Sequence, residues 1–253
     1  MKTALRSDVG RIRSINEDRA VIRNDINGIT IALLADGMGG HQAGDIASQT
    51  AMEVVSRELS HLQPTMTAVE WEVAIAHAIE RANSEIYSQS LSNPQLSGMG
   101  TTIIVALTCA GRLTVANIGD SRVYLLHNEE LKQLTEDHSL VNELLKNGQI
   151  SATEAATHPR RNMLTRALGT EMRVEADIKH VDWNPGDVLL LCSDGLTNMM
   201  SETAIVHTLQ QQESLDWKAD QLIEKALEAG GDDNVTVVLI EHAQEETDRG
   251  ESE

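Results

Sequence analysis

Phenylalanine is absent from this sequence of 253 residues, and all aromatic side chains together make up only 2% of it. Hydrophobic residues still amount to 41%, which is enough to form a buried core. Because aromatic side chains are so few, leucine, isoleucine, valine, alanine and methionine must fill that core. A chain of this length fits one sizeable domain, or at most two small ones.

Cysteine is nearly absent as well. Cys109 and Cys192 are the only two, and both lie in apolar runs. Cysteines in such runs predict reduced thiols in the core rather than a disulfide framework. The two cysteines and nine histidines show no zinc-ligand spacing, which argues against a zinc site.

Long hydrophobic runs are missing too. No apolar stretch approaches the roughly 20 residues that cross a membrane. Residues 1–8 carry charge early and lack the apolar stretch of a signal peptide. We therefore expect a cytoplasmic protein without membrane insertion.

Positive charge is in short supply, with 20 basic against 39 acidic side chains and a net charge of −19. Such a surface argues against nucleic acid and anionic membranes as partners. A phosphorylated substrate would also be repelled at long range. If phosphate binds here, cations must reverse the field locally, which points to metal ions and an arginine.

Hydrophobic periodicity predicts alternating groups of strands and helices. The predicted strands are short runs with tight turns, at residues 3–9, 18–24, 29–35, 101–108, 113–117, 123–127, 174–181, 188–192 and 235–241. The predicted helices cover residues 44–62, 68–90, 201–211 and 217–229. This order predicts an α+β fold in which helices pack outside antiparallel sheets.

Two segments differ from this pattern. Residues 138–170 contain short helical stretches, an interrupting proline and several arginines, and we interpret them as a flap beside the main sheet. Arg160, Arg161 and Arg166 of the flap either contact an acidic phosphopeptide or pair with the protein's own acidic surface. Residues 242–253 are polar and acidic, which predicts a disordered tail after a single domain of residues 1–241.

Acidic residues recur at the ends of the predicted strands. They lie in Glu17-Asp18, Asp36-Gly37, Gly119-Asp120, Asp194-Gly195 and Asp232-Asp233-Asn234. One such carboxylate is ordinary turn chemistry. Several on one rim of a sheet would repel one another unless one took up a proton or a cation bound between them. Ligands that are all oxygen favour Mg²⁺, Mn²⁺ or Ca²⁺ over Zn²⁺.

Asp36 is the centre of this pattern, because three glycines within Gly37-Met38-Gly39-Gly40 follow it and argue against a regular element there. Two metal ions bridged by one carboxylate, about 3.5–4 Å apart, would lower the pKa of a bound water and hold a phosphoryl group in line for attack. The cluster therefore predicts a metal-dependent hydrolase of phosphate esters.

At these residues the sequence resembles the type 2C, metal-dependent (PPM) family of protein serine/threonine phosphatases, especially its small bacterial members of the PrpC/Stp type. The matching segments are Arg13-Ser14-Ile15-Asn16-Glu17-Asp18, Ala35-Asp36-Gly37-Met38-Gly39-Gly40-His41, Gly98-Met99-Gly100-Thr101-Thr102, Ile118-Gly119-Asp120-Ser121-Arg122, Cys192-Ser193-Asp194-Gly195-Leu196 and Gly231-Asp232-Asp233-Asn234-Val235-Thr236. They occur in the family's order and spacing, and the match covers residues 3 to about 241.

The resemblance implies a fold and a dinuclear site. The fold is a four-layer α-β-β-α sandwich of two antiparallel sheets flanked by helix pairs. Asp36 would bridge two Mn²⁺ or Mg²⁺ ions, with the carbonyl of Gly37 on the second ion. Asp194 and Asp233 would complete the protein ligands of the first.

The remaining roles implied by the resemblance surround these ligands. Asp18 and Glu17 would hold metal-bound waters. Asp120, with Asp194, matches a third and weaker metal site of bacterial members. Arg13 would bind the substrate phosphate, for which its forked geometry is suited.

One position departs from the family pattern. Eukaryotic members have a histidine directly after the Asp-Gly pair, which is thought to protonate the leaving group, whereas this sequence has Met38. Methionine cannot donate a proton. His41 is a candidate general acid, a metal-bound water is another, and His41 alternatively anchors the glycine loop or caps the next helix.

The predicted function is hydrolysis of phosphoserine and phosphothreonine in proteins by a metal-activated water. The resemblance implies phosphoproteins and a cognate serine/threonine kinase as partners, and we expect a monomer. Two alternatives keep the same fold. One is a non-catalytic, pseudophosphatase-like binding module, and the other is a metal-dependent phosphatase or phosphodiesterase of small molecules.

Overall fold

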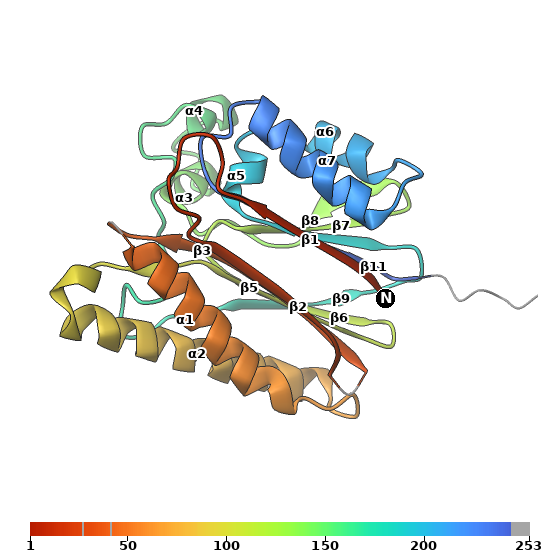
Figure 1. Cartoon of the computed structure of the whole chain (residues 1–253), viewed down its shortest axis with the longest axis horizontal. Helices are drawn as coiled ribbons and strands as arrows, with labels where there is room; N and C mark the ends of the chain where they lie inside the picture. The colour runs from red at the N-terminus through yellow and green to blue at the C-terminus, as the bar shows by residue number, and fades with distance from the viewer. Residues whose placement is uncertain (27, 41, 244–253) are drawn as a thin grey trace, which may run out of the picture.

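Two antiparallel sheets lie face to face, and helices cover their outer faces (Figure 1). The structure is a computed structural model that describes residues 1–26, 28–40 and 42–243. This arrangement is the predicted four-layer α-β-β-α sandwich, and the fold prediction is confirmed.

The five-stranded sheet has the order β1-β11-β10-β7-β8. Its strands are β1 (Lys2–Asp8), β11 (Val235–Glu241), β10 (Val188–Cys192), β7 (Arg122–His127) and β8 (Glu130–Gln133). The helices over its outer face are α6 (Glu202–Leu209) and α7 (Leu215–Glu228), and the short α5 (Asp194–Thr197) follows β10 (Figure 1).

The other sheet has the order β2-β3-β5-β6-β9, and the short β4 pairs with the end of β3. Its strands are β2 (Asp18–Ile26), β3 (Ile29–Met38), β4 (Gly100–Thr101), β5 (Ile103–Cys109), β6 (Arg112–Ile118) and β9 (Asp177–Asp182). Its outer face is covered by α1 (Ala43–Glu58) and α2 (Ala68–Ser92), with 3₁₀ turns at Leu59–His61 and Pro94–Leu96. The flap carries α3 (Leu140–Lys146) and α4 (Ala152–Ala156).

The central strands are buried on both faces, which explains their continuous apolar runs. Along β3, Ile31 and Leu33 pack in the core under α1 and α2, while Ala32 and Leu34 pack in the core between the sheets. Alternate side chains of a strand point to opposite faces, so one strand serves two cores. Cys109 and Cys192 are buried and unpaired, as expected for core thiols.

The structure corrects several predicted boundaries. β3 runs on to Met38 instead of ending at residue 35, because β4 pairs with Gly37 and Met38. β9 starts at Asp177 rather than at residue 174, and β8 had not been predicted. The helix expected over residues 44–62 ends at Glu58 and continues as a 3₁₀ turn.

Residues 244–253, most of the expected disordered tail, lie outside the described residues, so the division into a domain and a tail stays a prediction. None of the described helices is long and apolar enough to cross a membrane.

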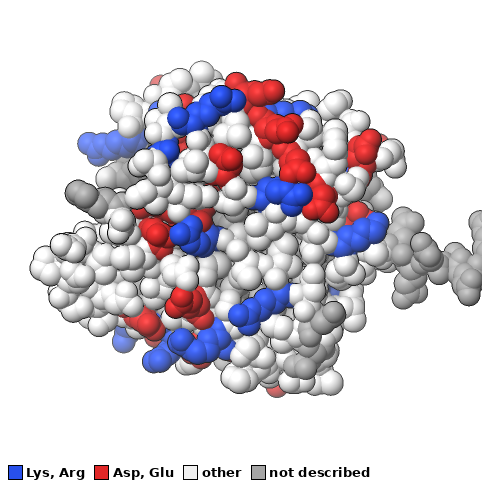
Figure 2. Space-filling view, in the orientation of Figure 1, with Lys and Arg blue, Asp and Glu red and all other residues white. Residues whose placement is uncertain are grey.

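Acidic side chains gather in a stripe over α7 on the face shown in Figure 2. The carboxylates of α7 are those of Asp216, Asp220, Glu224 and Glu228. Arg6 of β1 pairs with the first two of them. Lysines and arginines on this face are scattered between acidic groups, as expected for a chain with this net charge.

Candidate metal centre

A small cavity of about 190 Å³ opens where strand ends of both sheets meet beside the flap. It is lined by Arg13, Glu17, Asp36, Gly37, Met38, Gly39, Thr102, Asp120, Asn162, Leu164, Asp194, Asp233 and Asn234. The acidic strand ends of the sequence therefore do converge on one rim. Asp18 lies beneath the cavity and is only 2% exposed.

Asp36 is held by the sheet on both sides. Its register partner on β2 is Asp18. Its backbone N–H donates to Thr102 Oγ1 at 2.9 Å, and its carbonyl accepts from Thr102 N and Thr101 Oγ1, both at 2.9 Å. Two of these three bonds involve threonine hydroxyl groups, at the point where the regular ladder ends. The backbone of Asp36 therefore has little freedom to shift.

Glycine at position 37 lets helix α1 approach β3 closely. A Cβ atom on Gly37 would lie 2.1 Å from the carbonyl oxygen of Gly44 and 2.8 Å from that of Glu17. The N–H of Gly37 donates to the same Glu17 carbonyl at 3.2 Å. The glycine is therefore required by packing, and not because it interrupts the strand.

The other acidic residues come from loops that follow or precede strands. Asp194 begins α5 directly after β10, and its Oδ2 accepts from Asn198 Nδ2 at 3.0 Å. Asp233 precedes β11, and its Oδ2 accepts from Arg13 Nη2 at 2.8 Å. Asp120 follows β6.

The carboxyl groups raise one another's pKa values. Burial raises the pKa of Asp36 well above its ordinary value, and the charges of Asp18, Asp194 and Asp120 raise it further. Burial is also the largest cause at Asp18 and Asp120, whose pKa values rise to about 7. Burial followed by the charge of Asp233 raises the pKa of Asp194 to about 6. Ionising these carboxyl groups together is therefore unfavourable unless a cation binds between them.

Two buried carboxylate oxygens in this region accept no hydrogen bond. They are Asp18 Oδ1 and Glu17 Oε1. The other oxygen of Asp18, Oδ2, accepts from Ser193 Oγ at 2.7 Å. Buried acceptors are normally satisfied, so these two oxygens fit a role in holding water or a cation.

The donor chemistry of the cluster suits a hard divalent cation, since every candidate ligand is an oxygen. Within residues 1–26, 28–40 and 42–243, however, no three His, Cys, Asp or Glu side chains are gathered closely enough to hold an ion as they stand. The carboxylates lie around one cavity and influence one another's pKa values. To hold an ion, their side chains would have to move closer together.

Arg13 lies in the loop between β1 and β2, and its side chain is half exposed beside the cavity. Its guanidinium pairs with Asp233, so it reaches the carboxylate rim from the solvent side. The phosphate-binding role of Arg13 stays a prediction. His41, the candidate general acid, lies outside the described residues, and its role stays a prediction. Met38 lines the cavity.

His138 is hydrogen-bonded to the backbone of Gly119, the residue before Asp120. Its Nδ1 accepts from the N–H of Gly119 at 3.1 Å, so Nε2 carries the proton in the neutral ring and faces Asp177 Oδ2 at 3.2 Å. The pKa of His138 is lowered mainly by burial. His138 is therefore a structural residue.

The flap contributes residues that the sequence analysis missed. Asn162 and Leu164 line the carboxylate cavity, although nothing in their sequence context marks them. Arg161 lines a neighbouring cleft of about 400 Å³ that also includes Asp120 and Asp194. Arg166 instead pairs with Asp177 at 2.8 Å, which favours the structural alternative for this arginine.

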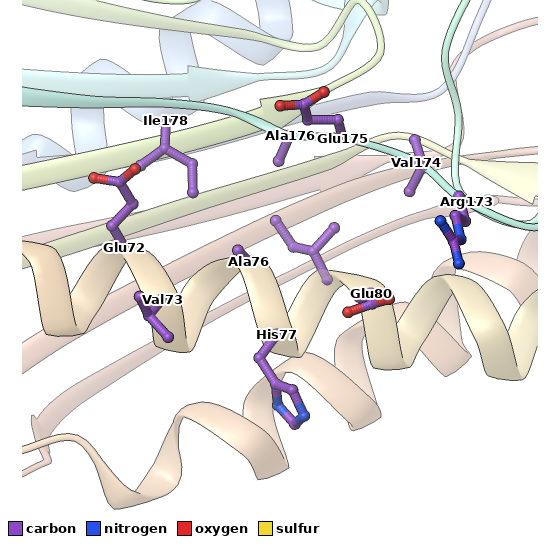
Figure 3. Close-up of a pocket in the computed structure, with 11 residues that line it drawn as sticks. Glu72, Val73, Ala76, His77, Glu80, Arg173, Val174, Glu175, Ala176 and Ile178 are labelled. Carbon is purple, nitrogen blue, oxygen red and sulfur yellow. The ribbon is translucent and has the colours of Figure 1, made fainter.

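A larger groove, of about 820 Å³, lies elsewhere, between α2 and residues 173–178 (Figure 3). Its floor includes Ala76 and Ile178, and Glu72 and Glu80 lie along it. It shares no residue with the carboxylate cavity. Size alone therefore does not locate the chemistry of this protein.

Comparison with known proteins agrees with this geometry. Residues 11–229 match the family model for protein phosphatase 2C. The serine/threonine phosphatase stp of Listeria monocytogenes serotype 4b (strain F2365) is 47% identical over 241 residues, covering 95% of this chain and 96% of that protein. The chain belongs to the protein phosphatase 2C family, so the predicted class, a bacterial metal-dependent protein serine/threonine phosphatase, is confirmed.

Solved structures show the same fold. The S. agalactiae serine/threonine phosphatase superposes with a TM-score of 0.91 at 37% identity, covering 96% of this chain and 99% of that one. The catalytic domain of the phosphatase PstP in complex with two manganese ions superposes with a TM-score of 0.84, also at 37% identity, covering 96% of this chain and 98% of that one.

Proposed function

We propose that this protein removes phosphate from phosphoserine and phosphothreonine side chains of other proteins at the carboxylate cavity. The observation that carries the proposal is the convergence of five acidic residues at one cavity, four of them in its lining and Asp18 buried next to Asp36, with an arginine beside them. These residues are Asp18, Asp36, Asp120, Asp194 and Asp233, and the arginine is Arg13. The cavity is small and polar, and suits a phosphoryl group better than a bulky apolar ligand.

The first part of the proposal concerns the metal ligands. Asp36 would hold two Mn²⁺ or Mg²⁺ ions, the second together with the carbonyl of Gly37. Asp194 and Asp233 would hold the first ion from the opposite sheet. Bound divalent ions supply a water of lowered pKa and neutralise phosphate oxygens. Asp120, with Asp194, offers a third and weaker position.

The second part concerns the groups around these ligands. Asp18 and Glu17 would hold water on the metal through their oxygens that accept no hydrogen bond. Arg13 binds the phosphate and sets its orientation by a bidentate contact. Of the candidates for protonating the leaving serine or threonine oxygen, Met38 has no suitable group, so His41 and solvent remain.

The third part concerns partners. A phosphatase of this specificity requires phosphoproteins, and a serine/threonine kinase that phosphorylates them is the expected opposing enzyme. The flap, with Asn162 at the cavity and Arg161 in the adjoining cleft, is the segment placed to contact the substrate protein.

A metal-dependence assay tests this function. Phosphoserine, phosphothreonine and phosphotyrosine peptides are compared side by side with Mn²⁺, with Mg²⁺ and with EDTA, and a phosphodiester serves as the control substrate. We expect release of phosphate from the first two peptides with metal and none with EDTA. Faster turnover of the phosphodiester, or activity that survives EDTA, would contradict the proposal.

A further inference from the structure

Asn234 ties the loop that carries Arg13 to the start of strand β11. Its Nδ2 donates to the carbonyl of Val9 at 2.8 Å and to that of Ile15 at 3.0 Å. Its Oδ1 accepts from the N–H of Glu17 at 2.8 Å. The side chain thus bonds both ends of residues 9–17, and Asn234 itself is only 6% exposed.

A second set of contacts ties the same two segments together. The N–H of Arg11 donates to the carbonyl of Gly231 at 2.8 Å, and Arg11 Nε donates to that of Leu227 at 2.7 Å. Gly10 has φ +80°, and a Cβ there would lie 2.3 Å from the carbonyl oxygen of Asp233. Residues 9–17 therefore pack closely against residues 227–234, although residues 9–17 belong to no helix or strand.

Arg13 lies in the middle of this loop of residues 9–17, which the side chain of Asn234 holds at both ends. Among the described residues, its guanidinium makes one hydrogen bond, to Asp233 Oδ2 at 2.8 Å, and the side chain is half exposed. A long side chain held only at its tip depends on its backbone for position. That backbone is anchored on both sides by Asn234, the residue after the proposed ligand Asp233.

We infer that Asn234 is a positioning residue, which sets the place of Arg13 relative to the metal ligands. The inference rests on the proposed phosphate-binding role of Arg13. Since Asp233 and Asn234 are adjacent, one backbone segment fixes both a metal ligand and the phosphate-binding arginine. The position of Arg13 relative to the proposed metal ligands would then depend on three side-chain hydrogen bonds of one residue.

An amide is required for this role because it donates twice and accepts once. A carboxylate of the same shape accepts from Glu17 N, but it cannot donate to the carbonyls of Val9 and Ile15. Asn234→Asp therefore keeps the shape and removes the two donated bonds. Asn234→Ala removes all three. The pair of variants separates loss of packing from loss of hydrogen bonding.

The first experiment needs neither metal nor activity. Hydrogen–deuterium exchange is measured in EDTA at the amides of Arg11 and Glu17, in the wild type and both variants. We expect exchange at Glu17 to speed up about tenfold or more in Asn234→Ala, since the Glu17 amide then loses its acceptor. Asn93→Ala, at an exposed turn far along the chain, is the matched control and should leave both amides unchanged. Unchanged exchange at Glu17 in Asn234→Ala would show that Asn234 does not hold the loop, and would overturn the inference.

The second experiment asks whether Asn234 acts through Arg13. Kinetics on a phosphothreonine peptide with Mn²⁺ are measured for Asn234→Ala, Arg13→Ala and the double variant, at a temperature where all are folded. We expect Asn234→Ala to raise KM about tenfold with a smaller effect on kcat, and to cost about twofold or less in kcat/KM when Arg13 is already alanine.

Equal losses in both backgrounds would show that Asn234 is merely structural, and would overturn the inference. A wild-type protein without phosphatase activity would instead contradict the proposed function. The exchange experiment would still decide whether Asn234 holds the loop of residues 9–17, so the two failures are distinguishable.

Discussion

Asp18 and Asp36 lie directly opposite each other on the paired strands β2 and β3, and both have raised pKa values. Side chains at opposite positions of an antiparallel pair lie on the same face of the sheet, and like charges there destabilise the pair. The Asp18 pKa rises mainly because of burial, although Ser193 donates a hydrogen bond to it. The fold thus keeps two carboxylates together that repel each other when they are ionised.

The stability of the metal-free protein should fall as pH rises. A carboxyl whose folded pKa is about 7, against an ordinary 3.8, stabilises the fold fully below the ordinary value. That contribution is lost as pH rises through the folded value. We expect the thermal midpoint in EDTA to drop by several degrees between about pH 5 and pH 8.

Metal should reverse this trend, because carboxylates must lose their protons to bind an ion. Added Mn²⁺ is expected to raise the midpoint more at pH 8 than at pH 5. Asp18→Asn, which removes one ionisable group without changing the shape, should flatten the pH dependence in EDTA. An unchanged slope in that variant would show that Asp18 is not part of the coupled cluster.

Asp36→Asn should abolish nearly all turnover, because an amide cannot hold two ions as a carboxylate does. Removing a group that only orients a metal ligand typically costs about 10–100-fold, so loss of this ligand should cost more than about 100-fold. Phosphate release from a phosphothreonine peptide with Mn²⁺ measures it. Asp232→Asn, at the exposed acidic neighbour of Asp233, is the control that should stay active. An active Asp36→Asn protein is incompatible with the proposed site.

Asp120→Ala should impair turnover while it spares the first two metal ions. Asp120 interacts most strongly with Asp194 within the cluster, whereas the proposed dinuclear position would use Asp36, Asp194 and Asp233. Titration calorimetry with Mn²⁺ should therefore still find the two tighter sites. Their loss in this variant would mean that Asp120 belongs to the dinuclear pair.

Gly37→Ala should destabilise the fold. The new methyl group would meet the backbone of Gly44 at 2.1 Å, and backbone cannot move aside as a flexible side chain can. Overpacking of this kind costs about 1–3 kcal/mol or more in the free energy of unfolding, measurable by denaturant titration. Gly40→Ala is the matched control, because a Cβ there has nothing within 4 Å. Equal stability of the two variants would contradict the close approach of α1.

Much of the site was visible in the sequence, because metal chemistry needs particular residues in a particular order. Asp36 and Asp194 each come at the end of an apolar run and directly before a glycine, and Asp233 lies in a turn after two glycines. Asn162 and Leu164 carry no such signal, since they reach the cavity only through the path of the flap. The sequence also contains Asn234, but its bonds to residues far away in the chain could not be read from it.

The sequence by itself determined the α+β class, the apolar strands and the carboxylates at their ends, because periodicity and turn residues act over short distances. Only the tertiary structure decided that Asp18 faces Asp36 and that β4 extends β3 past Asp36. It also decided that Asn234 holds the loop of Arg13. The position of the Arg13 loop depends on partners far apart in the chain, and a register shift between Arg23 and Ile26 decides which residue of β2 faces Asp36, so the alternating pattern alone does not specify either.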